Sequence, residues 1–133
     1  GLGVDALEIS EEDFLEAMGQ RKTSIKGFLL NQSMLAGVGN LYADEICYRT
    51  RVNPASTVAN IPVKKRKEIY AKMQEVLHIA VEQAPYYKEY PDNWFWHEWR
   101  YEGHEAPDGK SKVKSGKVAG RTTYWASPWQ RKY

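Results

Sequence analysis

The chain reads Gln32-Ser-Met-Leu-Ala-Gly-Val-Gly-Asn-Leu-Tyr-Ala-Asp-Glu45 at its most informative point. Two glycines, Gly37 and Gly39, are separated by one residue and precede Asn40, a residue type that favours helix N-caps. Glycine permits positive φ and lets another molecule approach the backbone closely. The first N–H groups of a helix that Asn40 opens would point toward a docking anion. The segment therefore predicts a phosphate-binding loop that leads into a helix.

Helical patterns surround this loop. Ser10-Glu-Glu-Asp13 joins a hydroxyl N-cap to an acidic first turn, which predicts a helix from Glu11 to Gly19. Further helices are expected from Ser24 to Leu30, from Leu41 to Arg49 and, most clearly, from Val63 to Ala84. The side chains expected to face inward are Phe14, Leu15, Met18, Leu41, Ile46, Tyr48, Ile69, Met73, Val76, Leu77, Ala80, Val81 and Ala84.

The length of 133 residues suits one domain with a small satellite. The sequence shows no apolar run long enough to span a bilayer and no secretory leader. We therefore expect a protein that is neither secreted nor membrane-bound, acting in the cytoplasm at the bacterial nucleoid or in a eukaryotic nucleus. The single cysteine, Cys47, excludes an intrachain disulfide and a cysteine-based zinc site, and we expect it to be buried.

The net charge of +2 hides an asymmetric distribution. Residues 1–16 contain six acidic and no basic side chains, whereas residues 110–133 contain seven lysines or arginines and no acidic residue. This pattern indicates a negatively charged partner near the C-terminal segment. A solvated basic tail would carry the same charge, but the interleaved aromatic residues and glycines favour a folded segment.

The composition changes after Pro85, and all five tryptophans lie beyond residue 93. Val113–Ser115 and Arg121–Trp125 predict two short strands joined by residues 116–120. A unit this short needs a metal, disulfides or dense aromatic packing. Since the single cysteine leaves neither a disulfide nor a cysteine-held metal, we expect the tryptophans to supply the packing.

Three segments carry a resemblance to a known family: Lys22-Thr-Ser-Ile-Lys26, Leu29-Leu-Asn-Gln32 and Ala36-Gly-Val-Gly-Asn-Leu-Tyr-Ala-Asp-Glu45. In this order they resemble the helix-two-turn-helix domain of the formamidopyrimidine-DNA glycosylase / endonuclease VIII family. Leu2-Gly-Val-Asp-Ala-Leu7 is similar to the family's entry into that domain, and Arg121-Thr-Thr-Tyr-Trp125 with Gln130 is similar to the second strand of its DNA-binding finger. The resemblance implies a mainly α fold, with a helix-two-turn-helix domain over residues 1–90 and a β-hairpin finger over residues 91–133.

The chain departs from the family in its finger. Most bacterial members hold this finger with four cysteines around zinc, and those positions fall here at Ala106, Gly109, Ala126 and Trp129. The resemblance is therefore to the zincless finger of some members, and we expect neither metal nor cofactor. His78, His97 and His104 are too scattered to form a metal site. We expect Trp125, Trp129 and Trp99 to replace the metal as the packing centre.

A second departure concerns catalysis. In the family, an N-terminal proline amine forms a Schiff base with the sugar and an adjacent glutamate moves protons. This chain starts at Gly1-Leu2-Gly3, already at the entry to the helical domain. We therefore expect a monomeric C-terminal fragment of a base-excision repair glycosylase and AP lyase, with no catalytic residue of its own. Its partners would be damaged double-stranded DNA and the N-terminal catalytic domain.

The resemblance also assigns DNA contacts. Asn40 would hold a phosphate beside the lesion, although an ordinary N-cap explains the same residue, and the two roles are compatible. Arg121 resembles the finger arginine that grips phosphates around the extruded nucleotide, whereas taken alone it is a solvated loop residue. The other candidate DNA contacts are Lys22, Gly37, Gly39, Lys112, Lys114 and Lys117. The basic run Lys64–Lys67 is expected to be a solvated helix face.

Two other functions remain open at this point. The chain could act alone as an AP lyase through the Gly1 amine or a lysine, because an amine of lowered pKa forms a Schiff base with an abasic aldehyde. It could instead bind RNA, since related helix-two-turn-helix units occur in a ribosomal protein.

Overall fold

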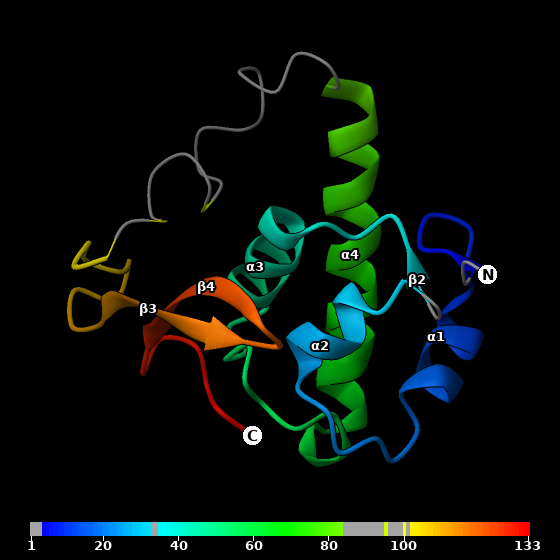
Figure 1. The fold of residues 1–133 in the computed structure, drawn as a ribbon, viewed down its shortest axis with the longest axis horizontal. Helices are drawn as coiled ribbons and strands as arrows, with labels where there is room; N and C mark the ends of the chain where they lie inside the picture. The colour runs from blue at the N-terminus through cyan, green and yellow to red at the C-terminus, as the bar shows by residue number, and fades with distance from the viewer. Residues whose placement is uncertain (1–3, 33–34, 84–94, 96–99, 101) are drawn as a thin grey trace.

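The computed structural model describes residues 4–32, 35–83, 95, 100 and 102–133. Helices α1 and α3 pack against the long helix α4, α2 packs against α3, and the hairpin β3–β4 lies beside α3 (Figure 1). The helices are α1 Glu11–Met18, α2 Ile25–Leu30, α3 Asn40–Arg49, the 3₁₀ turn η1 Val58–Asn60 and α4 Val63–Gln83. The strands are β1 Val4–Asp5, β2 Leu35–Ala36, β3 Lys112–Val118 and β4 Arg121–Ser127. This mainly α arrangement with a C-terminal β-hairpin confirms the predicted fold class.

Serine caps fix the starts of the first two helices. The Ser10 hydroxyl accepts a hydrogen bond from the Asp13 N–H, and the Ser24 hydroxyl accepts one from the Gly27 N–H, so both predicted helix starts are confirmed. Helix α3 differs, because Gly39 is its N-cap and Asn40 is already helical. The prediction that the Asn40 side chain caps α3 is therefore wrong. Its amide is committed to another partner, described below.

The inward face of α4 supplies much of the helical core. Ile69, Met73, Val76, Leu77 and Ala80 are buried there, as predicted. The remaining predicted core residues fall into four groups. Val81 is 61% exposed at the edge of that face, which contradicts the prediction. Leu15 and Leu41 are only partly buried. Phe14, Met18, Ile46 and Tyr48 are buried, and Ala84 lies outside the described residues.

Arg66 joins three segments at the start of α4. Its guanidinium donates to the carbonyls of Ile61 at 2.8 Å, Gly19 at 2.8 Å and Val58 at 2.9 Å. The basic run Lys64–Lys67 was expected to be a solvated face, and Arg66 contradicts this because only 7% of it is exposed. A planar guanidinium with five donors can bind several carbonyls at once, which offsets the unfavourable position of a cation at a helix N-terminus.

The hairpin is longer than its sequence predicts. Residues Gly116, Lys117 and Val118, expected in the loop, pair with Thr123, Thr122 and Arg121, which leaves Ala119 and Gly120 as the turn. Both turn residues have positive φ, 53° and 74°, as a type I′ hairpin turn requires. Gly116 lies inside the strand, where a Cβ would be 3.1 Å from the Trp125 ring. This close approach favours glycine at the position.

The core of the finger differs from the expected tryptophan centre. Its buried residues are Tyr48, Phe95, Ala106, Val113 and Ala126, with Tyr124 and Trp129 packed against them. The Tyr48 and Phe95 rings are stacked, with centroids 4.3 Å apart and planes 10° from parallel. Trp129 contributes as expected, Trp125 covers Gly116 instead, and Trp99 lies outside the described residues. Three of the four positions that the resemblance gives to cysteines thus belong to an apolar cluster.

We predict that Arg66→Ala lowers the free energy of unfolding by about 3 kcal/mol, because it removes the side-chain donor from the carbonyls of Ile61, Gly19 and Val58. Arg66→Lys should recover only part of this loss, since an ammonium cannot reach three carbonyls in a plane. Urea unfolding followed by circular dichroism measures both. Lys67→Ala is the control, because it removes the same charge from an exposed neighbour; an equal loss in this variant would contradict the role of Arg66.

Candidate nucleic-acid interface

Helix α3 and strand β4 run side by side with matched spacing. The Asn40 amide donates to the Thr122 carbonyl at 3.1 Å, and one turn later the Asp44 carboxylate accepts from the Tyr124 N–H at 3.2 Å. A further turn along, Tyr48 shares a cluster with Ala126. Four helical residues rise about 6 Å and two strand residues about 6.6 Å, so alternate strand residues keep step with successive helical turns. The starts of α3 and β4 are therefore aligned.

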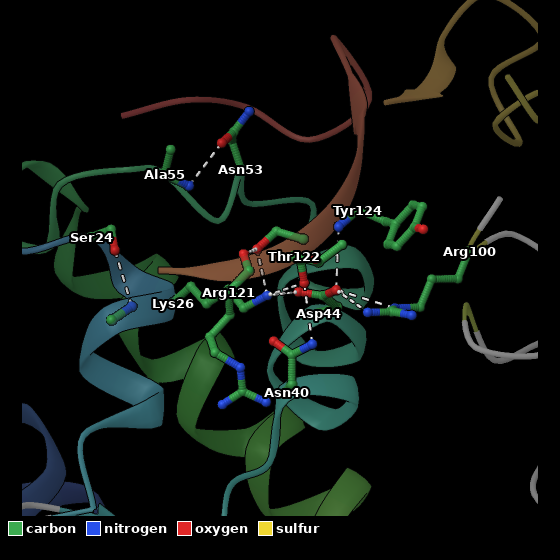
Figure 2. Close-up of polar contacts among 12 residues, drawn as sticks. Ser24, Lys26, Asn40, Asp44, Asn53, Ala55, Arg100, Arg121, Thr122 and Tyr124 are labelled. Carbon is green, nitrogen blue, oxygen red and sulfur yellow. Dashed lines mark hydrogen bonds and ion pairs between the residues drawn. The ribbon is translucent and has the colours of Figure 1, made fainter. Parts of the chain in front are cut away.

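This alignment brings two of the predicted contact residues together. Arg121 is the first residue of β4 and is exposed, and the next residue, Thr122, holds the Asn40 amide. Figure 2 shows the Arg121 side chain lying beside Asn40. Asn40 Oδ1 has no hydrogen-bond partner among the described residues. The structure thus places an exposed guanidinium next to the opening turn of a helix that lacks a side-chain cap.

A buried ion pair lies beneath this pair of residues. Lys26 and Asp44 have no exposed side-chain surface, and Lys26 Nζ is 2.7 Å from Asp44 Oδ1. The same ammonium donates to the Thr122 carbonyl at 3.3 Å and to the Thr123 hydroxyl. Burial lowers the pKa of Lys26 and raises the pKa of Asp44, and the hydrogen bond between the two groups opposes both shifts.

Arg100 completes the surroundings of the Asp44 carboxylate. Its Nε and Nη2 atoms each lie 3.2 Å from Asp44 Oδ2, and its guanidinium stacks over the Tyr124 ring at 4.5 Å (Figure 2). Sequence reasoning placed Lys26 on its helix without a role and did not single out Asp44 or Arg100. The available signal was the spacing of Asn40 and Asp44, four residues apart on one helix face.

The glycine loop before α3 is held by its own side chains. Gln32 accepts a hydrogen bond from the Gly37 N–H and donates one to the Val38 carbonyl, both at 3.2 Å. Gly37 has a φ of 106°, which only glycine adopts readily. Gly39, expected to be a second turn glycine, is extended with a φ of −89°. A Cβ at Gly39 would meet only the Tyr42 ring, at 3.7 Å, so the fold itself does not require glycine there.

The predicted lysines differ in their position relative to Asn40 and Arg121. All four, Lys22, Lys112, Lys114 and Lys117, are exposed. Lys117 lies directly opposite Thr122, whereas Lys114 and Lys112 lie opposite Trp125 and Ser127, successively farther along the hairpin. Lys22 precedes the start of α2. On that helix, a Cβ at Gly27 would lie 3.5 Å from the Cβ of Ala119 in the hairpin turn.

Other site types receive little support. Cys47 is buried, as expected, and burial raises the pKa of its thiol. Within the described part of the chain, no three His, Cys, Asp or Glu residues gather as a metal site would need. None of the helices in the described residues has the length and apolar character of a membrane span.

Comparison with known proteins identifies relatives for this arrangement. Residues 2–88 match the family model described as the formamidopyrimidine-DNA glycosylase H2TH domain. A formamidopyrimidine-DNA glycosylase of Solibacter usitatus is 42% identical over 81 residues, which cover 61% of this chain and 31% of the relative. One from Arabidopsis thaliana is 31% identical over 139 residues, which cover 99% of this chain and 34% of the relative. The chain spans about a third of the length of these relatives.

Solved structures share the fold. The Lactococcus lactis Fpg bound to DNA with an abasic site matches with a TM-score of 0.81 at 21% identity, covering 98% of this chain and 52% of that chain. MutM in complex with DNA containing carbocyclic 8-oxo-G matches with a TM-score of 0.81 at 23% identity, covering 98% of this chain and 51% of that chain. Since the family model spans well over half of the sequence, the chain belongs to the formamidopyrimidine-DNA glycosylase family and carries its H2TH domain.

Proposed function

We propose that this chain is the DNA-binding part of a base-excision repair glycosylase that acts on oxidised bases. The observation that carries the proposal is the aligned start of α3 and β4, which places Asn40 beside the exposed Arg121. Proteins with similar sequences are named as formamidopyrimidine-DNA glycosylases. Structures with the same fold were determined in complex with abasic or damaged DNA. In this proposal the two residues clamp phosphates around a flipped, damaged nucleotide.

The chemistry of the two groups suits phosphate. A guanidinium can form two parallel hydrogen bonds to phosphate oxygens. The Asn40 amide carries two N–H groups, of which the Thr122 carbonyl takes one and leaves the other for a ligand. The opening turn of α3 has no side-chain cap, so the positive end of its dipole favours an anion at the same place.

The proposal extends to the partners. The catalytic proline and glutamate would belong to an N-terminal domain of the same protein, and we assign no catalytic residue to the described residues. The binding partner would be double-stranded damaged DNA, met by a monomer in the bacterial nucleoid or a eukaryotic nucleus. The helix-two-turn-helix unit would occupy residues 1–90 and the finger residues 91–133. The family match does not favour the alternatives of RNA binding or of a lyase acting alone.

We predict that Asn40→Ala and Arg121→Ala each weaken binding to a duplex with an abasic-site analogue by about 1–3 kcal/mol, roughly 5- to 150-fold. Arg121→Ala should also reduce the slope of log affinity against log salt by about one unit, because one phosphate contact is lost. Fluorescence anisotropy across a salt series measures both effects. The control is Lys67→Ala, which removes an exposed cation from α4. Unchanged affinity in both Asn40 and Arg121 variants would refute the clamp.

The hairpin register yields a second prediction. Lys117→Gln should weaken DNA binding several-fold, because Lys117 lies opposite the residue that holds Asn40. Lys112→Gln, with the same charge change five residues away on the strand, should have a smaller effect. The same titration compares the two variants. Equal losses would show that the lysines attract DNA diffusely and that the register does not matter.

A further inference from the structure

Asp44 is a fully buried carboxylate to which the proposed clamp gives no direct role. It accepts hydrogen bonds or ion pairs from three separate parts of the chain: Lys26 on α2, Arg100, and the Tyr124 N–H on β4. A buried charge is costly unless donors surround it. Asp44 therefore fixes where these three parts of the chain can lie relative to α3.

The hydrogen bonds of this group continue into the start of β4. Lys26, held by Asp44, donates to the Thr122 carbonyl at 3.3 Å and to the Thr123 hydroxyl. That hydroxyl in turn donates to the Arg121 carbonyl at 2.8 Å. The backbone from Arg121 to Tyr124 is thus bound, directly or through Lys26, to one carboxylate. The Thr122 carbonyl is also the acceptor of the Asn40 amide.

Such a buried pair adds little to stability, since the cost of removing two charges from water offsets their attraction. It is selective for geometry. Sliding β4 by one residue along α3 would turn the Tyr124 N–H away from Asp44 and move the Thr122 carbonyl away from both Lys26 and Asn40. The ion pair therefore specifies the register of β4 on α3, and that register sets the distance between Arg121 and Asn40.

We propose that Asp44 is a positioning residue for DNA binding: through Lys26 and the Tyr124 N–H it holds Arg121 beside Asn40 without touching the ligand. This inference rests on the clamp proposed above. It also predicts a change in DNA affinity opposite in direction to the one that net charge predicts. Removing a carboxylate makes the protein more positive, so electrostatics alone would strengthen binding to a polyanion. If Asp44 acts by position, its removal weakens binding.

The test is the affinity of Asp44→Asn for the abasic-analogue duplex, measured by anisotropy in the same salt series. We expect binding at least tenfold weaker than in the unmodified chain. The effect should shrink to less than threefold when Asn40→Ala and Arg121→Ala are already present, because the clamp that Asp44 positions is then gone. Glu75→Gln is the charge control, since it removes an exposed carboxylate from α4 and should leave the affinity equal or slightly higher.

A second variant separates a loss of folding from a loss of positioning. Lys26→Met/Asp44→Asn leaves the net charge unchanged and leaves no unpaired ammonium in the interior, so it is expected to fold. Urea unfolding and circular dichroism confirm the folded fraction, and Val76→Ala, a core change on α4, shows what loss of stability alone does to affinity. The double variant should bind DNA at least tenfold more weakly, while Val76→Ala should bind normally when folded.

The outcomes separate the two proposals. If Asn40→Ala and Arg121→Ala leave the affinity unchanged, the clamp itself is wrong. If they weaken binding while Asp44→Asn and Lys26→Met/Asp44→Asn bind as well as or better than the unmodified chain, the clamp stands and the positioning role is overturned. A loss of affinity in Asp44→Asn that is as large without Asn40 and Arg121 as with them would also overturn the positioning role.

Discussion

The Lys26 ammonium and the Asp44 carboxylate have no contact with solvent, so every hydrogen bond they make must come from the protein. That requirement fixes the positions of α2, α3 and β4 together, because Lys26 and Asp44 between them bind the backbone or side chains of Thr122, Thr123 and Tyr124. The hydrophobic core of the four helices would tolerate small shifts of the hairpin, since dispersion and burial have no direction. The ion pair does not tolerate them. The position of the surface that we propose for DNA binding follows from this constraint.

The finger solves the stability problem of a small unit by sharing its core. A segment of this size that has no cysteine for a disulfide or a cysteine-held metal cannot bury enough of its own surface. Here Tyr48, from helix α3, is stacked on Phe95 and packs with Trp129. The positions that the family resemblance gives to cysteines at 106 and 126 are alanines, small enough to lie inside that cluster. The proposed boundary near residue 90 therefore separates two segments of sequence that share one structural cluster.

The elements that could be predicted from the sequence are those set by local chemistry. Serine caps and the periodicity of α4 fixed helix positions to within a residue or two, because caps and amphipathic faces act over a few residues. The hairpin was predicted too short, since pairing of Lys117 with Thr122 depends on a partner strand and a turn with two positive φ angles. Asn40 was predicted to cap α3 because nothing local reveals a competing carbonyl at Thr122. The burial of Lys26 was missed for the same reason: lysine is rarely buried, and its partner lies on another helix.

The contact between Lys26 and Thr122 joins residues 96 positions apart in the chain. Closing so long a loop costs conformational entropy that is recovered only when both ends are in place, which makes contacts of this kind late events in folding. The helices can form by local interactions well before that step. A chain whose helices are complete but whose hairpin has not docked would carry Asn40 without Arg121 at its side. Under the proposed clamp, DNA would favour the fully folded chain over such intermediates and would raise its apparent stability by mass action. Affinity for DNA would then report long-range closure, a step that helical content does not reveal.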